Sequence, residues 1–209
     1  MHHETLEKQS TPESTEPTLK EQIIEIIRFV VIAAVIVIPV RVFIAQPFIV
    51  SGTSMIPTFE HRDYLIIDEI SYRFREPQRG DVIVFRYPEQ PSQFFIKRII
   101  ALPRETVRIT DSVVTITSEE DPTGFILEEM YLPENTETLA RNESLTLPDD
   151  YYFVMGDNRS FSSDSRIWGP LPRDLIVGKA WLRLWPLNNI GFKPGSHSFD
   201  ILSDNNDIL

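Results

Sequence analysis

The sequence predicts a mainly β protein, with an irregular β-sheet or barrel domain that follows one N-terminal transmembrane helix. Three observations predict it: one long apolar stretch near the amino terminus, several short β-branched and aromatic segments after it, and no long amphipathic helical period beyond Ala45. With 209 residues, of which 42% are hydrophobic, the chain can form one anchored domain with a core of its own.

Composition excludes several kinds of partner. The formal net charge of -11 argues against nucleic acid, because a phosphate backbone calls for a basic face. The chain has no cysteine, so it has neither disulfides nor thiolate ligands, and its 4 histidines do not stand at the spacing of a metal-binding pair. We therefore expect no nucleic acid, no metal and no cofactor.

The amino-terminal part predicts a tail and then an anchor. Residues 1–22 are polar and lack an apolar period, which is typical of a disordered tail. The uncharged residues 29–40 would span only about 18 Å as a helix, which is short of the roughly 30 Å hydrocarbon core. Arginine stems at Arg28 and Arg41 can reach the headgroups, so we expect a transmembrane helix over residues 23–45.

The sequence also bears on whether this apolar stretch is cleaved and on how it is oriented in the membrane. A cleaved signal peptide fits poorly, because Phe43 is bulky where a cleavage site needs a small residue. Charges flank both ends of the stretch, so charge bias alone does not fix its orientation.

Residues 46–195 are expected to form the β-rich domain. Short runs bounded by Gly, Pro, Asp or Asn predict strands at residues 81–87, 94–101, 107–110, 113–117, 151–155 and 176–185. Residues 118–142 are acidic and weakly patterned, which indicates an insertion or small subdomain exposed to solvent. Residues 196–209 are polar and expected to form a loose tail.

One serine is a candidate nucleophile. Ser54 lies between Gly52 and Pro57, which suggests a tight turn with an exposed hydroxyl and backbone amides that could bind an oxyanion. A serine between Gly and Pro is more often an ordinary loop residue. A nucleophilic serine needs a base to take its proton.

Lys97 could be that base. Strand alternation puts Lys97 on the face of Phe95 and Ile99, where an ammonium would be desolvated and its pKa lowered. The alternative is an edge lysine that extends past its neighbours into solvent. Lys179, which has a similar setting, serves as a comparison.

The run of residues 155–170 is dense in hydroxyls, carboxylates and arginines directly after a predicted strand. Such a run can pair internally and form an ordered loop beside a site. A salt-bridged surface turn is an equally good interpretation of the composition.

Together these runs resemble one family, the type I signal peptidases, which are membrane-anchored serine proteases that remove signal peptides from exported proteins. Residues 51–58 are similar to the family's nucleophile box, residues 80–85 to its next strand, residues 97–103 to its lysine box, and residues 156–166 to its final box. The four motifs occur in the family's order and cover most of residues 46–180.

The resemblance implies a Ser/Lys dyad in which Ser54 is the nucleophile and Lys97 the general base. By the same resemblance, Ser162 orients the lysine amine. The polar residues of the final box would brace the site; they are Asp157, Arg159, Asp164 and Arg166.

The resemblance also implies a substrate and a location. The substrate is a signal peptide that binds as an extended strand, with small side chains one and three residues before the cut. Met55, adjacent to the nucleophile, is a candidate pocket residue. The protein would be a single-pass protein in contact with lipid, in the cell membrane or an internal membrane such as the thylakoid, with its catalytic domain on the extracytoplasmic side.

The chain departs from the family pattern at two positions. Some members have a serine hydroxyl in the oxyanion hole two residues before the nucleophile, where this chain has Gly52, and Ser51 is one place too early. Arg104 stands where many members have glycine.

Three other interpretations compete with the peptidase. Self-cleaving repressors share the dyad logic, but they carry a basic DNA-binding domain in place of an apolar anchor. A histidine base is disfavoured, because His61 lies among charged residues and His197 in the expected tail. An anchored β domain that binds partners without catalysis is the remaining alternative.

Overall fold

The computed structural model describes residues 19–39, 45–139, 144–197 and 199. The chain divides into two compact units, Met1–Val40 and Arg41–Leu209. Most of the predicted tails, residues 1–18 and 200–209, lie outside the described residues.

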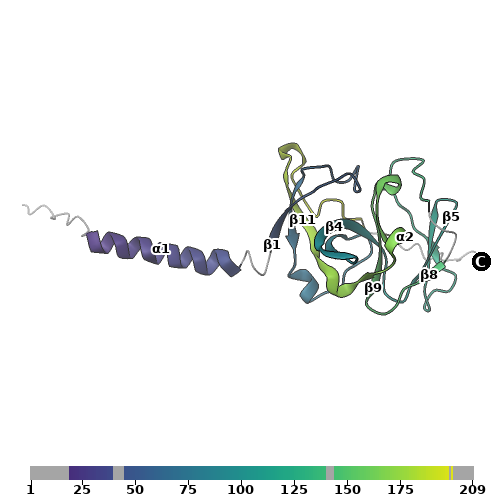
Figure 1. Cartoon of the computed structure of the whole chain (residues 1–209), viewed down its shortest axis with the longest axis horizontal. Helices are drawn as coiled ribbons and strands as arrows, with labels where there is room; N and C mark the ends of the chain where they lie inside the picture. Colours follow the sequence, from purple (N-terminus) through teal and green to yellow (C-terminus); the bar gives the residue numbers. More distant parts are fainter. Residues whose placement is uncertain (1–18, 40–44, 140–143, 198, 200–209) are drawn as a thin grey trace, which may run out of the picture. The chain divides into compact units, whose positions relative to one another are not determined.

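The first unit contains helix α1, Leu19–Pro39, coloured purple in Figure 1. Its apolar side chains are exposed, among them Ile24, Phe29 and Val35. Within the described part of the chain, no helix combines the length and the apolarity needed to cross a bilayer. The helix also ends before the predicted limit, and Ala45 begins a strand instead of ending a helix.

The second unit is mainly β, as predicted. Its larger sheet has eight strands in the order β1-β2-β11-β3-β4-β9-β10, with β12 paired to β11. The neighbouring strands in this sheet are antiparallel. Its strands are β1 Ala45–Ile49, β2 Tyr64–Asp68, β3 Val82–Tyr87, β4 Gln90–Ala101, β9 Tyr151–Met155, β10 Leu171–Pro172, β11 Ile176–Trp185 and β12 Gly191–Phe192.

A smaller sheet of four strands has the order β7-β6-β5-β8. Its strands are β5 Thr106–Thr110, β6 Val113–Thr117, β7 Phe125–Ile126 and β8 Ser144–Thr146. In Figure 1, β5 and β8 lie beyond β9, at the opposite end of the domain from β1. One core cluster joins the two sheets, because Ile100 and Phe153 of the larger sheet pack with Val107 and Ile116 of the smaller one.

All the predicted strands are present, and the structure adds six that were not predicted, β1, β2, β7, β8, β10 and β12. The acidic segment, residues 118–142, contributes β7 and buries Leu127 and Thr138, so it is not solvated throughout. The expected loose tail also differs at its start, where Phe199 packs against a core cluster.

The two faces of β4 explain why the strand matters for the site. Phe95 and Ile99 pack into one core cluster, whereas Ile96 and Ile100 pack into two others. Lys97 and Arg98 are therefore buried on opposite faces, with 3% and 0% of their surfaces exposed.

Candidate active site

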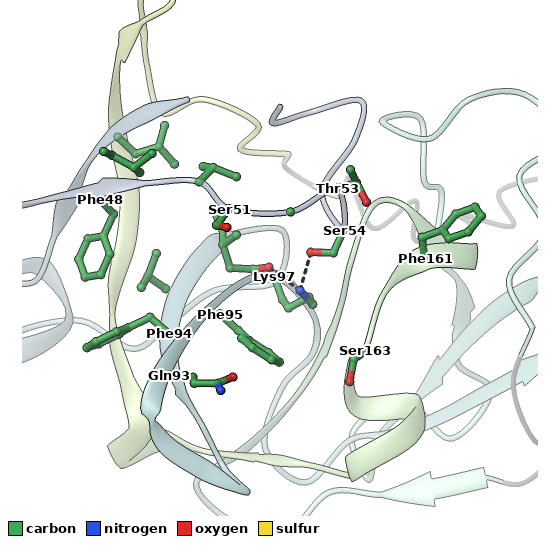
Figure 2. A pocket seen from close by; sticks show the side chains of 16 residues that line it. Phe48, Ser51, Thr53, Ser54, Gln93, Phe94, Phe95, Lys97, Phe161 and Ser163 are labelled. Atoms are coloured by element: carbon green, nitrogen blue, oxygen red, sulfur yellow. Dashed lines mark hydrogen bonds between the residues drawn. The ribbon is translucent and has the colours of Figure 1, made fainter. Parts of the chain in front are cut away.

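The candidate site is formed by Ser54, in the turn after β1, and Lys97, on β4. The lysine Nζ donates a hydrogen bond to the serine Oγ at 2.7 Å and another to the Ile96 carbonyl oxygen at 2.9 Å (Figure 2). The two residues are 43 positions apart in the sequence. The fold thus brings together the two side chains that the sequence predicted as nucleophile and base.

Burial changes the acidity of the lysine. Desolvation lowers the pKa of Lys97 from 10.5 to about 8, although the carboxylates of Asp164 and Asp157 act in the opposite direction. With such a pKa, roughly a tenth of the amine is neutral at pH 7 and half at pH 8. A neutral amine can accept the serine proton at the separation that the structure shows.

Aromatic side chains form the wall beside the amine. The Lys97 Nζ lies 5.2 Å from the centroid of the Phe95 ring. Tyr87 stacks on Phe95 at 4.5 Å, and Trp168 meets Tyr87 edge to face at 6.0 Å. The predicted apolar face of β4 therefore exists, and two further aromatic residues support it.

A polar loop after β9, residues 156–166, contacts residues 51–58 directly. We call residues 51–58 the nucleophile turn, because they contain the candidate nucleophile Ser54. The Asn158 backbone N–H donates to the Ser54 carbonyl oxygen at 3.0 Å, and its side-chain amide donates to the Thr53 carbonyl oxygen at 3.0 Å. A Cβ atom at Gly156 would lie 2.3 Å from the Ser162 Oγ and 2.4 Å from the Ser54 carbonyl oxygen. Only glycine fits between the two segments at this point.

Asp157 connects the same loop to β4. Its carboxylate accepts hydrogen bonds from Arg98 Nε at 2.9 Å and Nη2 at 2.6 Å, and from the Thr58 hydroxyl at 2.5 Å. The side chains of Arg98 and Asp157 are 0% and 1% exposed. This buried pair ties the residue next to Lys97 to the loop that contacts Ser54.

Asp164 orders the second half of the loop. Its carboxylate accepts from the Gly156 N–H at 3.0 Å and from Arg166 Nε at 2.8 Å. It also caps the short helix α2, Ser165–Trp168, by accepting from the Arg166 backbone N–H at 3.3 Å. Arg166 in turn donates to the Arg159 carbonyl oxygen at 2.7 Å.

Arg159 contacts the acidic segment. Its guanidinium forms a bidentate pair with Glu129 and donates to the Thr138 hydroxyl at 2.7 Å. Its Nε donates to the Gly156 carbonyl oxygen at 3.2 Å. All four predicted bracing residues thus lie in one hydrogen-bonded cluster, which contacts the nucleophile turn through Asn158.

Two other predicted residues have settings that differ from the expectation. Ser162 is buried, but among the described residues its Oγ has no hydrogen-bond partner, and the Lys97 amine bonds elsewhere. Met55 is 1% exposed and packs with Val50 and Phe59 in the core. Its side chain lies in the core and does not line the groove described next.

A groove of about 540 Å³ runs along the dyad (Figure 2). β9 pairs with β4 only from Arg98 onward, so the preceding part of β4 borders the groove. The residues that line the groove are Phe48, Ile49, Val50, Ser51, Gly52, Thr53, Ser54, Leu65, Val84, Gln93, Phe94, Phe95, Ile96, Lys97, Phe161 and Ser163.

The turn beside the groove contains a backbone conformation that suits glycine. Gly52 has φ of +105°, where L residues are rarely found. A serine in this backbone conformation would be strained. The neighbouring Ser51 is exposed and lines the groove.

Sequence reasoning missed several residues of this cluster. Five residues contact either the predicted bracing residues or the nucleophile turn, and no role had been predicted for them; they are Arg98, Glu129, Tyr131, Asn158 and Thr58. Thr58, Arg98 and Asn158 lie within the motifs that resemble the family, but the sequence assigned them no role. Glu129 and Tyr131 lie outside those motifs. Within the described part of the chain, no cluster of three or more His, Cys, Asp or Glu residues is placed to bind a metal ion.

Comparison with known proteins identifies the family. The model of the family described as "Signal peptidase, peptidase S26" matches residues 23–185. The chain belongs to this family. A signal peptidase I of Leptolyngbya laminosa is 37% identical over 86% of this chain and 88% of that protein.

More distant relatives are found in plants and other bacteria. Thylakoidal processing peptidase 1 of Arabidopsis thaliana is 36% identical over 72% of this chain and 45% of that protein. A crystal structure of a signal peptidase I from Enterococcus faecalis is 32% identical, covers 50% of this chain and 97% of that one, and has a TM-score of 0.42. Membership of the signal peptidase family makes this chain a peptidase, and the four sequence motifs had indicated the same family.

Proposed function

We propose that this signal peptidase family member cleaves N-terminal signal peptides from exported preproteins, with Ser54 as nucleophile and Lys97 as general base. The observation that carries the proposal is the 2.7 Å separation of the Lys97 Nζ and the Ser54 Oγ, with Lys97 buried and Ser54 partly exposed. Family membership supports the substrate class, since relatives from several organisms are signal peptidases.

The chemistry follows from the acidity of the lysine. The neutral amine removes the Ser54 proton as Oγ attacks the scissile carbonyl carbon, and a tetrahedral intermediate forms. The protonated amine then gives its proton to the leaving amine, which departs and leaves an ester on Ser54. Water, deprotonated by Lys97, hydrolyses this ester and regenerates the hydroxyl.

The groove suits an extended peptide. The part of β4 before Arg98 borders it on one side, and residues 49–54 border it on the other. A peptide in this position could form backbone hydrogen bonds to β4 as an added strand, while the aromatic rings of Phe48 and Phe94 limit the room for side chains. Small side chains near the cut suit such a confined site.

The amino-terminal part would bring the enzyme to its substrate. The exposed apolar side chains of α1 favour insertion into lipid, and residues 40–45 could extend the apolar stretch. Tethering raises the effective concentration of a protease toward a signal peptide in the same membrane. We place the enzyme in the cell membrane or a thylakoid-type membrane as a single-pass protein, with the catalytic domain on the extracytoplasmic side.

Two substitutions test the proposal on the full chain in detergent. Ser54→Ala and Lys97→Ala should each abolish cleavage of a purified preprotein, while Lys179→Ala, which changes a lysine outside the groove, should leave it intact. Product sequencing should find the cut at the end of the signal peptide. Cleavage that survives Ser54→Ala, or a wild-type protein that binds preprotein without cutting it, would contradict the proposal.

A further inference from the structure

Two side chains of the acidic segment, Glu129 and Tyr131, contact the buried arginines Arg98 and Arg159. Glu129 accepts from Arg159 Nη1 at 2.8 Å and from Nη2 through its other oxygen, and the two side chains are 10% and 0% exposed. The ring of Tyr131 lies 3.8 Å from the Arg98 guanidinium carbon. The acidic segment, to which the sequence assigns no role, therefore contacts the hydrogen-bonded cluster of the predicted bracing residues.

We propose that Glu129 and Tyr131 are positioning residues for catalysis, which act on Ser54 through the arginines of the polar loop. The inference rests on the proposed function, because it concerns the same site. It gives a role to part of the acidic segment: Glu129 and Tyr131 hold the arginines that connect to Ser54 and Lys97.

Contacts connect Glu129 to the nucleophile in a few steps. Glu129 fixes the Arg159 guanidinium, whose Nε donates to the Gly156 carbonyl oxygen at 3.2 Å. The backbone between them includes Asn158, which donates its N–H to the Ser54 carbonyl oxygen at 3.0 Å. A shift of Arg159 would therefore move the loop that holds the nucleophile turn.

Charge balance makes Glu129 necessary for this arrangement. Arg98 and Arg159 are both buried, and the charge of Asp157 acts on Arg159 as well as pairing with Arg98. Without the Glu129 carboxylate, Arg159 would be attracted toward Asp157 and would compete with Arg98 for it. Glu129 thereby leaves Asp157 free to hold the strand of Lys97.

Tyr131 touches both arginines at once. Its hydroxyl donates to Glu129 at 2.6 Å and accepts from Arg159 Nη2 at 3.2 Å, while its ring covers Arg98. A cation–π contact with a desolvated guanidinium is favourable, and the ring also excludes water from the pair. Tyr131 therefore fixes the spacing between the two arginines.

The first experiment measures kcat and KM for preprotein cleavage by the full chain in detergent. Glu129→Gln should lower kcat by about tenfold or more, with KM within about twofold, because a misplaced nucleophile affects chemistry more than peptide binding. Tyr131→Phe, which keeps the ring and removes the hydroxyl, should lower kcat by less than Glu129→Gln does. The matched control is Glu128→Gln, at the exposed neighbouring position, which should behave as wild type.

Glu129→Gln leaves the buried Arg159 without its carboxylate partner and could unfold the protein. A second variant therefore separates the effect on stability from the effect on positioning. In Glu129→Met/Arg159→Met both charges are replaced by apolar side chains, which often restores stability. We expect the melting temperature to return toward wild type while kcat stays low, since the bond to Gly156 is still lost. Recovery of kcat together with the melting temperature would overturn the inference.

The two proposals fail in different ways. If the wild-type protein cleaves the preprotein and Ser54→Ala does not, the proposed function stands. A kcat of Glu129→Gln equal to that of Glu128→Gln would then overturn the positioning role alone. If the wild-type protein does not cleave the preprotein, the proposed function fails and the positioning role fails with it.

Discussion

Asn158 and Ser54 are joined by a backbone hydrogen bond of 3.0 Å from the Asn158 N–H to the Ser54 carbonyl oxygen. The Asn158 side chain adds a second bond, to the Thr53 carbonyl oxygen. The nucleophile turn is thus anchored to the polar loop, and the same loop is anchored to β4 through Asp157 and Arg98. Because Lys97 precedes Arg98 on that strand, the loop connects Ser54 with Lys97.

The pH dependence of cleavage should follow the protonation of Lys97. Burial lowers the pKa of its amine to about 8, and only the neutral amine can act as base. We expect kcat to rise with pH through about 8 and to level off about one pH unit above it. A kcat profile of the full chain measured with a preprotein checks this, and a rate that stays constant across this range would contradict the assigned base.

Removing the buried lysine should stabilise the protein at neutral pH. Because its folded-state pKa is about 8 against 10.5 ordinarily, the folded protein binds fewer protons than the unfolded chain between these values, and its stability rises with pH across them. Below about pH 8 the full cost of burying the charged amine applies. Lys97→Met should therefore raise the free energy of unfolding at pH 7 by up to about 3 kcal/mol.

Thermal unfolding of the inactive variant at neutral and at alkaline pH measures this effect. The increase in stability of Lys97→Met over the wild type should become smaller as the pH rises toward 10.5, the ordinary value of the lysine pKa. Lys179→Met is the matched control, because Lys179 is only partly buried. If the melting temperature of Lys97→Met at pH 7 were lower than that of the wild type, the charged amine would not destabilise the folded protein, and the prediction would be wrong.

The buried pair of Asp157 and Arg98 should be essential for stability, whereas an exposed pair should not. Asp157→Ala leaves a fully buried guanidinium without its carboxylate, which should cost about 3–5 kcal/mol. Asp149→Ala breaks a pair with Arg104 whose side chains are 82% and 78% exposed, and it should cost less than about 1 kcal/mol. Denaturant unfolding of both variants gives the comparison, and similar losses would contradict the prediction.

Local patterns predicted much of this protein. The period of two along residues 94–101 placed Lys97 on the face of Phe95 and Arg98 on the opposite face, as the structure has them. The short β-branched runs likewise predicted six strands of the two sheets. Such patterns succeed because strand alternation decides burial locally.

The features that the sequence did not predict depend on contacts between segments far apart in the chain, and the spacing of residues in the sequence does not encode such contacts. The sequence predicts that Arg159 braces the site, but not that its partner is Glu129, 30 residues earlier on an acidic segment. Adjacency to Ser54 suggested a pocket role for Met55, whereas the turn directs its side chain into the core. The path of a turn is set by packing on either side, so neighbours in sequence can face opposite ways.

The close approach of Gly156 to the nucleophile turn gives the sharpest prediction. A methyl group at this position would lie 2.3 Å from the Ser162 Oγ and 2.4 Å from the Ser54 carbonyl oxygen, so the two segments would have to separate. The Asn158 bond to Ser54 would lengthen, and the nucleophile would leave the reach of Lys97. Gly156→Ala should therefore lower kcat by about a hundredfold or more.

Gly191→Ala is the matched control, because a Cβ atom there would meet no atom within 4 Å. This variant should keep wild-type kcat and melting temperature. Gly156→Ala should also lower the melting temperature, since overpacking costs about 1–3 kcal/mol. If Gly156→Ala cleaved the preprotein as fast as Gly191→Ala, the contact between loop and turn would not control the dyad, because the segments could then separate without loss of rate.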